Sequence, residues 1–302
     1  MIYTVTLNPA IDLFYRFPEP FRAGEIHRAE TQLLRPGGKG VNTVIVLHRL
    51  GIPAKALGFA AGQTGELFLK LLDGCCDSDF VLLSEGETRI NAKIEAKPET
   101  AVNGPGPAID ENSFSLLLKK LEALTPEDIL VLSGKGAPND FLRLGARCKE
   151  AGAKLAVDTS GEALRACMEL HPWLIKPNAE ELAQLLNCPV PDTESACSRV
   201  EQAQAMGAQN VLLSRGAEGA MLLCADGALF QAKAEGDFNI LSTVGAGDSL
   251  TAGFLAAKEQ DQSDAEALCL AVASGTAAAC DAWLPGMQAI RGILPCVRCE
   301  TY

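Results

Sequence analysis

The stretch STVGAGD at residues 242–248 is the point around which this chain is organised. Two glycines flank an alanine, so backbone amides there can approach a ligand without interference from a Cβ atom. The apolar periodicity of Leu250, Phe254 and Leu255 begins directly behind this stretch. We therefore expect a loop that leads into a helix N-terminus, where free N–H groups and the positive end of the helix dipole bind anions.

Asp248 closes this stretch and has two interpretations. Beside a bound anion, its carboxylate could orient a hydroxyl nucleophile and accept the proton of that hydroxyl. Alternatively, the glycines form an ordinary turn and Asp248 caps the helix. The residues of this stretch leave both interpretations open, so the rest of the chain has to decide between them.

A second glycine-rich stretch, RPGGKGVN at residues 35–42, precedes a helical pattern. It is not a Walker loop, because Leu33 stands where the first glycine belongs and Gly40 replaces the required serine or threonine. Glycines followed by Lys39 and Asn42 at a helix start are still suited to close contact with a polyhydroxy or phosphorylated ligand. A solvated turn is the alternative.

Residues 88–95 alternate between apolar and polar side chains, which predicts a strand with two different faces. Ile90, Ala92 and Ile94 share one face, and Arg89, Asn91, Lys93 and Glu95 share the other. An ordinary half-exposed strand would show the same pattern. Two cations and an amide on one face would also suit a lid over a sugar phosphate, with NGPGP at residues 103–107 as its hinge.

From residue 112 onward, helical and strand patterns alternate regularly. Strands are predicted at 129–132, 154–157, 173–175 and 210–213, and helices at 112–123, 139–150, 161–169, 179–186, 194–206 and 263–279. Strands at 2–7, 54–59 and 80–83 and a helix at 65–72 precede them. This alternation predicts an α/β fold in which helices cover both faces of a mostly parallel sheet. Polar residues and glycines gather after strand C-termini, the ligand-binding edge of such sheets.

Composition narrows the classes of function. The 302 residues suit one large α/β domain, and 48% apolar residues are enough for a sizeable core. A formal net charge of −12 argues against a nucleic-acid or anionic-membrane partner, so an anionic substrate would need lysines or arginines placed locally. No apolar run approaches transmembrane length, and the N-terminus lacks the pattern of a signal peptide.

Cysteine and histidine usage argues against further kinds of chemistry. The eleven cysteines are scattered along a chain without a secretion signal, so we expect reduced thiols and a cytoplasmic protein. Cys296 and Cys299 form a CxxC pair with no second ligand pair nearby, which does not favour a zinc site. The three histidines occur in no hydrolase-triad or zincin pattern.

Six ordered stretches of the sequence match one known family. They are TLNPAID at 6–12, GGKGVN at 37–42, TRIN at 88–91, WLIKPNAEE at 173–181, SRGAEGA at 214–220 and STVGAGDS at 242–249. Over nearly its whole length, the chain resembles the ribokinase-like, pfkB-type sugar kinases. The first and third stretches resemble most the branch of 1-phosphofructokinases and tagatose-6-phosphate kinases.

The resemblance implies a single ribokinase-like kinase domain over residues 1–302, with a small β-sheet lid beside the central sheet. Parts of 12–36 and 88–105 would form the lid, and such lids in the family often pair across a homodimer. The implied reaction is ATP-dependent phosphorylation of a ketohexose monophosphate, foremost fructose 1-phosphate to fructose 1,6-bisphosphate. Tagatose 6-phosphate is the nearest alternative substrate. A non-catalytic sensor of sugar phosphate or nucleotide is an alternative from another class.

The resemblance also implies roles for individual residues. Asp248 would be the catalytic base, and Gly245, Ala246 and Gly247 would hold the transferring phosphoryl group in an anion hole. Asn178 and Glu181 match the family's N-x-x-E pattern and would orient Mg²⁺ through water. The sugar-binding set would comprise Asp12, Gly37, Gly38, Lys39, Asn42, Arg89 and Asn91. The ATP-binding set would comprise Lys176, Asn178, Ser214, Gly216, Gly219 and Thr243.

Two cationic residues and one difference from the family's sequence pattern bear on the choice of substrate. Lys39 and Arg89 would hold the phosphate already on the sugar, which supplies the local positive charge that this acidic chain needs. The family often has SGSxP where this chain has SGKGAP at 133–138, so Lys135 could add a phosphate contact or alter sugar choice. No family pattern maps onto AAACDAW at 277–283, so the nucleotide preference stays open.

Overall fold

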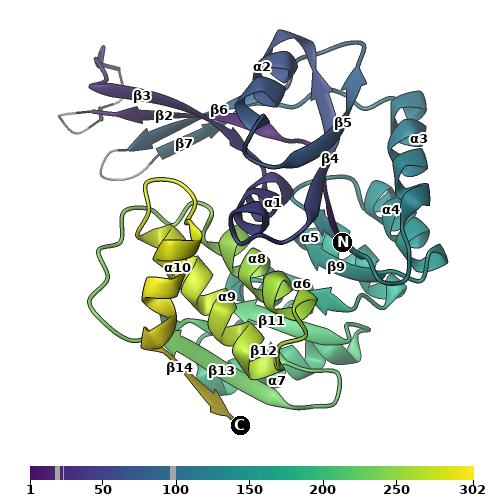
Figure 1. Cartoon of the computed structure of the whole chain (residues 1–302), viewed down its shortest axis with the longest axis vertical. Coiled ribbons are helices and arrows are strands. Elements are labelled where there is room, and N and C mark those ends of the chain that lie inside the picture. Colours follow the sequence, from purple (N-terminus) through teal and green to yellow (C-terminus); the bar gives the residue numbers. More distant parts are fainter. Residues whose placement is uncertain (18–20, 23, 96–99) are drawn as a thin grey trace.

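The computed structural model describes residues 1–17, 21–22, 24–95 and 100–302. Its largest element is a sheet of ten strands in the order β14-β13-β12-β11-β10-β9-β8-β1-β4-β5 (Figure 1). The strands from β11 to β5 pair in parallel: β1 (Ile2–Thr6), β4 (Ala54–Ala61), β5 (Asp77–Leu83), β8 (Ile129–Ser133), β9 (Lys154–Asp158), β10 (Leu174–Ile175) and β11 (Asn210–Ser214). Central strands such as β8 are buried along their whole length, which is why they are continuous apolar runs.

Helices cover both faces of this sheet and bury two separate apolar clusters (Figure 1). One layer comprises α1 (Lys39–Arg49), α2 (Gly62–Leu72), α8 (Ala246–Glu259), α9 (Asp264–Ala279) and α10 (Met287–Ile293). The other comprises α3 (Glu111–Lys120), α4 (Pro138–Glu150), α5 (Gly161–Cys167), α6 (Ala179–Leu186) and α7 (Thr193–Ala205). The three-layer α/β architecture that the sequence predicts is therefore confirmed.

A second, four-stranded sheet extends to one side of the body (Figure 1). Its order is β3-β2-β6-β7, with β3 (Thr31–Gly37), β2 (Ala10–Arg16), β6 (Arg89–Glu95) and β7 (Thr100–Asn103). The pair β2–β6 is parallel, and the other two pairs are antiparallel. This sheet, called the lid sheet below, confirms the expected small β-sheet. Residues 18–20, 23 and 96–99 of the expected lid lie outside the described residues.

The C-terminal edge of the large sheet differs from the expected pattern. Three strands there were not predicted, and they pair antiparallel: β12 (Ala220–Leu223), β13 (Leu229–Ala234) and β14 (Val297–Thr301). The helix α10 was also not predicted. β12 and α10 are short, and β14 is separated from its partner β13 by more than sixty residues, so no local periodicity marks these elements.

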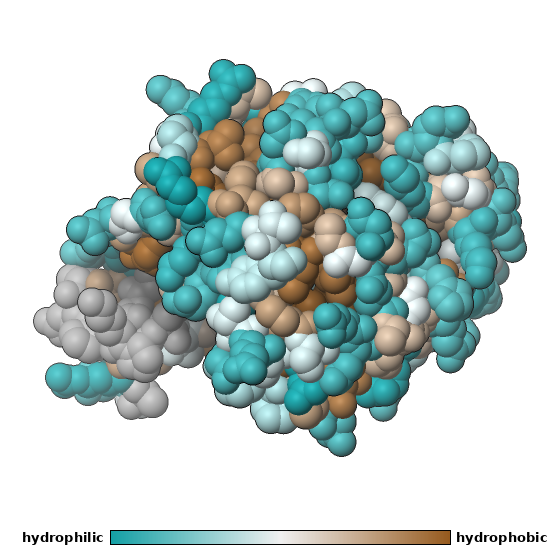
Figure 2. All heavy atoms as spheres, turned by 90° about the horizontal axis from the view of Figure 1, so that it is seen from below, coloured by the Kyte–Doolittle hydropathy of each residue, from teal (hydrophilic) through white to brown (hydrophobic). Residues whose placement is uncertain are grey.

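The surface seen from below is mostly hydrophilic, with apolar groups gathered in smaller patches (Figure 2). Among the described residues, no helix combines the length and the apolar character that crossing a membrane requires. All eleven cysteines lie in the described part and are free thiols.

Candidate active site

The glycine-rich stretch at 242–248 forms the loop and helix start that the sequence predicts. Gly245 is the N-cap of α8 and has a φ of 79°, a left-handed conformation that glycine adopts without strain. A Cβ atom at this position would lie 2.8 Å from Cδ2 of Leu284. Close packing and backbone conformation therefore both require a glycine at the start of this helix.

Asp248 lies in the first turn of α8 and does not cap it. Its side chain is buried, and the Nδ2 amide of Asn42 in α1 donates a hydrogen bond to Oδ2 at 2.7 Å. Thr43 Oγ1 donates to the backbone carbonyl of Asp248 at 3.4 Å. Since α1 begins at the second glycine-rich stretch, the two glycine clusters of the sequence meet at this carboxylate.

The surroundings of Asp248 hold its pKa in a range useful for acid–base chemistry. Its pKa is raised to about 6, mainly because the carboxylate is buried and in part because of the negative charge of Asp158. The hydrogen bond from Asn42 and the positive charges of Lys39 and Lys176 act in the opposite direction. Above this pKa, the carboxylate is ionised and can accept a proton.

Two lysines and two acids form an ion-pair network beside Asp248. Lys39 Nζ lies 2.9 Å from Asp158 Oδ1 and 3.3 Å from Glu181 Oε1, and Lys176 Nζ lies 3.4 Å from Asp158 Oδ1. Burial lowers the pKa of Lys39, but these acids raise it more, so its ammonium stays charged. Lys176 Nζ is also 3.6 Å from the position that a Cβ on Gly247 would take. The ammonium group of Lys176 therefore lies beside the glycine loop.

Asp158 is a central residue of this network that sequence reasoning did not select. It ends β9 and its side chain is almost fully buried. The only signal in the sequence is an acid directly after an apolar strand, and many strands end in polar residues. Only the parallel pairing of β9 with its neighbours shows that this acid reaches the same edge as Lys176.

The expected magnesium residues occupy the start of α6 and bond to each other. Asn178 Oδ1 accepts from the amide of Glu181 at 2.8 Å, and Glu181 Oε2 accepts from the amide of Asn178 at 2.9 Å. In the described part of the chain, Asp158 Oδ2 is buried without a hydrogen-bond partner. No cluster of three or more metal-binding side chains occurs among the described residues. These oxygens suit a Mg²⁺ ion held mainly by water and substrate phosphates, not by a protein cage.

The lid sheet carries the expected sugar-binding polar groups. Asn91 Nδ2 donates to Asp12 Oδ1 at 2.8 Å across the β2–β6 pair. Gly37 lies against the carboxylate of Asp12, where a Cβ atom would collide with it. Gly38, with a φ of 121°, ends the turn into α1. The lid therefore presents a buried acid and amide beside the start of α1.

Arg89 extends from the first position of β6 toward the edge of the large sheet. Its Nη2 donates to the backbone carbonyl of Asn8 at 3.0 Å, which lies just after β1. Within the described residues, Arg89 Nε has no hydrogen-bond partner although it is buried, and the same holds for Asn8 Oδ1, Thr6 Oγ1 and Ser133 Oγ. Lys39 does not join Arg89, because its ammonium is bound by Asp158 and Glu181.

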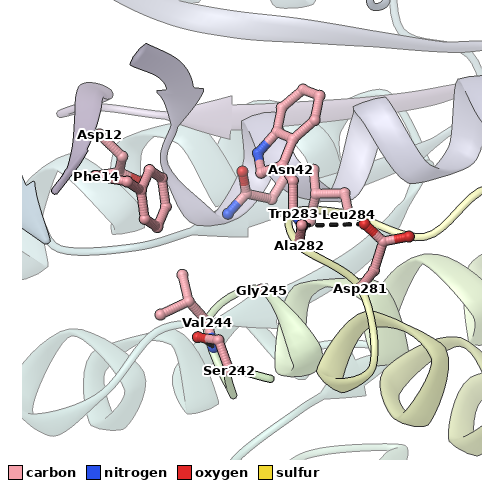
Figure 3. A pocket seen from close by; sticks show the side chains of 10 residues that line it. All are labelled: Asp12, Phe14, Asn42, Ser242, Val244, Gly245, Asp281, Ala282, Trp283 and Leu284. Carbon is pink, nitrogen blue, oxygen red and sulfur yellow. Dashed lines mark hydrogen bonds between the residues drawn. The ribbon is translucent and has the colours of Figure 1, made fainter. Parts of the chain in front are cut away.

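A pocket separates the lid sheet from the glycine loop (Figure 3). Its lining residues are Asp12, Phe14, Asn42, Ser242, Val244, Gly245, Asp281, Ala282, Trp283 and Leu284. The segment 281–284, between α9 and α10, was not expected to line it. Nothing in the local sequence marks these residues as pocket residues, because their place depends on how α9 packs against α8.

The expected ATP-binding residues lie along the strand ends beyond the glycine loop. Ser214 ends β11 and pairs with Asn178 through an isolated β-bridge. Gly216 and Gly219 have φ values of 57° and 80°, and a Cβ on Gly219 would collide with the Ala232 carbonyl. Gly219 is thus required by the turn into β12. Thr243 accepts a backbone hydrogen bond from Ala246 at 3.2 Å.

Comparison with known proteins agrees with this geometry. Residues 5–282 match the model of the pfkB family carbohydrate kinases. The chain is 35% identical to the 1-phosphofructokinase of Bacillus subtilis (strain 168), covering 99% of both chains. It is 36% identical to the D-tagatose-1-phosphate kinase of Bacillus licheniformis, covering 91% of both.

Among solved structures, the chain is similar to phosphofructokinase-2 from Escherichia coli in complex with substrates and products. The TM-score is 0.90 at 27% identity, covering 97% of this chain and 98% of the other. The family match spans both glycine-rich stretches and the lid strands. The chain therefore belongs to the pfkB family of carbohydrate kinases.

Proposed function

We propose that this protein transfers the terminal phosphoryl group of ATP to fructose 1-phosphate and thereby forms fructose 1,6-bisphosphate. The observation that carries the proposal is the buried Asp248 carboxylate, with its pKa of about 6, directly beside the amides that open α8. The similarity to proteins named 1-phosphofructokinase supports this choice of substrate.

The arrangement suggests a division of labour among the residues of the glycine loop. Asp248 accepts the proton of the attacking hydroxyl, and Asn42 fixes the orientation of the carboxylate. The amides of Gly245 and Gly247 hold the transferring phosphoryl group, and the amide of Ala246, which the sequence also suggests, already donates to the carbonyl of Thr243 at 3.2 Å. Phosphoryl transfer depends mostly on positioning and on neutralising negative charge, so this loop supplies what the reaction needs.

Positive charge beside the loop would neutralise the polyphosphate. Lys176 and Lys39 stand within the network that includes Asp158 and Glu181. Mg²⁺, when bound, would supply further neutralisation of the phosphate oxygens, with Asn178, Glu181 and Asp158 holding its water shell. We place the remainder of the ATP site at Ser214, Gly216, Gly219 and Thr243.

The phosphate already on the sugar would bind at Arg89. Arg89 lies at the start of β6 and donates through Nη2 to the carbonyl of Asn8. Within the described residues, its buried Nε and Asn8 Oδ1 have no hydrogen-bond partner, which supports a polar ligand at this position. Lys39 remains a second candidate for this phosphate, although two carboxylates already neutralise it. Asp12 and Asn91 would bind sugar hydroxyls, with Gly37 and Gly38 allowing close approach.

A second substrate is favoured by one specific observation. The relative from Bacillus licheniformis is named D-tagatose-1-phosphate kinase, and tagatose differs from fructose only in the configuration at C4. We therefore place tagatose 1-phosphate beside the tagatose 6-phosphate that the sequence suggests. A non-catalytic sensor is disfavoured, because Asp248, the glycine loop and the lysines are all in place.

We also propose that the chain is one domain with the lid sheet over the pocket, that it acts in the cytoplasm, and that it forms a homodimer through the lid. The face of the lid opposite Asp12 carries Leu13, which is half-buried, and Ile90 and Val102, which are 40% and 60% exposed. An apolar face of this kind supports an interface between two subunits.

A coupled ADP-release assay over a panel of phosphosugars tests the proposed function. We expect the highest kcat/KM for fructose 1-phosphate, followed by the 1- and 6-phosphates of tagatose. Asp248→Asn should lower kcat by about 10² or more and leave ATP binding nearly unchanged. A kcat within threefold of the wild type for this variant would remove Asp248 from the mechanism.

A further inference from the structure

Trp283 lines the pocket (Figure 3). Its indole ring contacts two arginines from different elements. The guanidinium carbon of Arg35, in lid strand β3, lies 4.8 Å from the centroid of the indole ring. The guanidinium carbon of Arg49, at the end of α1, lies 4.7 Å from the same centroid. Both distances are within the range of a cation–π contact, and tryptophan gives the strongest such contacts.

The tryptophan is anchored to the body of the protein independently of the lid. Its amide donates to Asp281 Oδ1 at 3.0 Å, and the next residue, Leu284, accepts a hydrogen bond from the Arg49 guanidinium at its carbonyl. Leu284 is buried and packs directly against Gly245 of the glycine loop. The position of the indole ring is therefore tied to the loop that would hold the phosphoryl group.

The other arginine ties the same ring to the sugar side. Arg35 pairs in register with Asp12 across β3 and β2, so the two residues lie side by side on one face of the lid sheet. Asp12 is the buried acid of the proposed sugar site. A movement of β3 away from the body would separate Arg35 from Trp283, whereas the contact between Arg49 and Trp283 lies within the body and would remain.

We propose that Trp283 is a positioning residue that joins the lid to the glycine loop through Arg35. Closure of the lid over the phosphosugar and binding of the nucleotide at the loop then favour each other. This inference rests on the proposed kinase function, because it assigns one ligand to each side of the ring. By reciprocity, each ligand should strengthen the binding of the other by the same factor.

Calorimetry on the full-length protein tests this coupling directly. We expect a nonhydrolysable ATP analogue to lower the Kd of fructose 1-phosphate at least about fivefold. Arg35→Gln should reduce this factor to less than about twofold, and Trp283→Phe, which keeps an aromatic ring, should retain most of it. Wild-type coupling in Arg35→Gln would overturn the proposal.

Steady-state kinetics separates a positioning role from a structural one. Trp283→Ala should raise KM for both substrates by about 5- to 30-fold, the range for a partly desolvated cation–π contact, and change kcat less than threefold. A purely structural role would instead lower the thermal midpoint and kcat with both KM values unchanged, and that result would overturn the proposal.

Fluorescence tests the inference even if the variant Trp283→Ala does not fold. The chain has two tryptophans, and Trp173 packs on Phe254 and does not line the pocket, so Trp173→Phe leaves Trp283 as the only source of tryptophan emission. We expect fructose 1-phosphate to change its emission, and an unchanged spectrum at saturation would contradict the inference. If the wild-type protein turns over no phosphosugar, the proposed function fails instead.

Discussion

The carboxylate of Asp248 is buried and accepts a hydrogen bond from Asn42, and its protonation state therefore depends on pH. Burial disfavours the carboxylate and the hydrogen bond from Asn42 favours it, and burial outweighs that bond, so the pKa is raised to about 6. A base must be unprotonated to act. Activity is thus expected to be complete above this pKa and to be lost as the pH falls through it.

The acid side of the pH–rate profile should therefore report the protonation of Asp248. Below about pH 6, kcat/KM should fall about tenfold per pH unit. Asn42→Ala removes the hydrogen bond that favours the charged form of Asp248, so the fall in kcat/KM should begin at a higher pH. The phosphate of the substrate titrates in a similar range, but its contribution is the same for both proteins. If kcat/KM fell at the same pH in the wild type and in Asn42→Ala, Asp248 would not be the titrating group.

Arg89 should affect the binding of the phosphosugar and not the binding of ATP. Arg89→Ala should raise KM for fructose 1-phosphate about 10- to 150-fold, because a buried charge-assisted contact is lost, and leave KM for ATP within threefold. Lys93→Ala is the matched control, since Lys93 lies four positions further along the same strand and donates to Asn103 Oδ1. If KM for ATP rose and KM for fructose 1-phosphate did not, the assignment of Arg89 to the phosphosugar would be wrong.

Individual residues were predictable where a motif fixes them and not where topology does. The pair of glycine stretches pointed to Asp248 and Asn42, and the structure brings these two residues into contact. Asp158 and Trp283 have no motif. They reach the site because β9 ends at the ligand edge and because the segment after α9 folds back over the glycine loop.

At the scale of elements, α6 shows how one residue serves both folding and function. Glu181 closes a capping box with Asn178 and also pairs with Lys39. The cap stabilises the helix by satisfying amides at its start. The ion pair places a negative charge beside the proposed phosphoryl-transfer centre. These two contributions can be separated by the choice of substitution.

Glu181→Gln should therefore separate the two roles. The amide oxygen of glutamine can still accept from Asn178, so the thermal midpoint should change little. The lost charge should lower the apparent affinity for Mg²⁺ about 10-fold or more in assays that titrate the metal. Glu181→Ala also removes the hydrogen bond from the Asn178 amide to Glu181 Oε2, one of the two bonds of the capping box, at a cost of about 1 kcal/mol of unfolding free energy. An unchanged Mg²⁺ requirement in Glu181→Gln would exclude Glu181 from the metal site.

Elements were predictable wherever a strand and its covering helix follow each other in the chain. The parallel strands from β8 to β11 and their helices match the expected segments closely. The strand β5 begins at Asp77, although its apolar run begins only at Phe80, because pairing with β4 extends it over exposed polar residues. The strand β14 could not be predicted, because its structure comes from a distant partner.

For the whole molecule, the apolar outer face of the lid sheet predicts association. The wild type should sediment as a dimer at micromolar concentration. Val102→Lys places a charge on this face and should raise the dissociation constant about tenfold or more. Leu116→Lys is the matched control, because Leu116 is 53% exposed but lies on α3 in the body. A monomeric wild type would contradict the dimer proposal and leave the site unaffected.

The net charge of −12 makes the whole molecule dependent on a few local cations to bind its substrates. Arg89, Lys39 and Lys176 supply that charge at the ligand edge of the large sheet. A sugar without a phosphate would leave the guanidinium of Arg89 without its ligand in a closed pocket, which is costly. Discrimination between phosphorylated and free sugar is therefore the property that depends most directly on this architecture.

The measurement that tests this account most directly is kcat/KM for fructose 1-phosphate against kcat/KM for free fructose at saturating ATP and Mg²⁺. We predict a ratio of at least about 10³, the discrimination expected when a site built for a polar group meets a substrate that lacks it. Comparable turnover of free fructose would contradict the phosphosugar site and leave only the kinase fold standing.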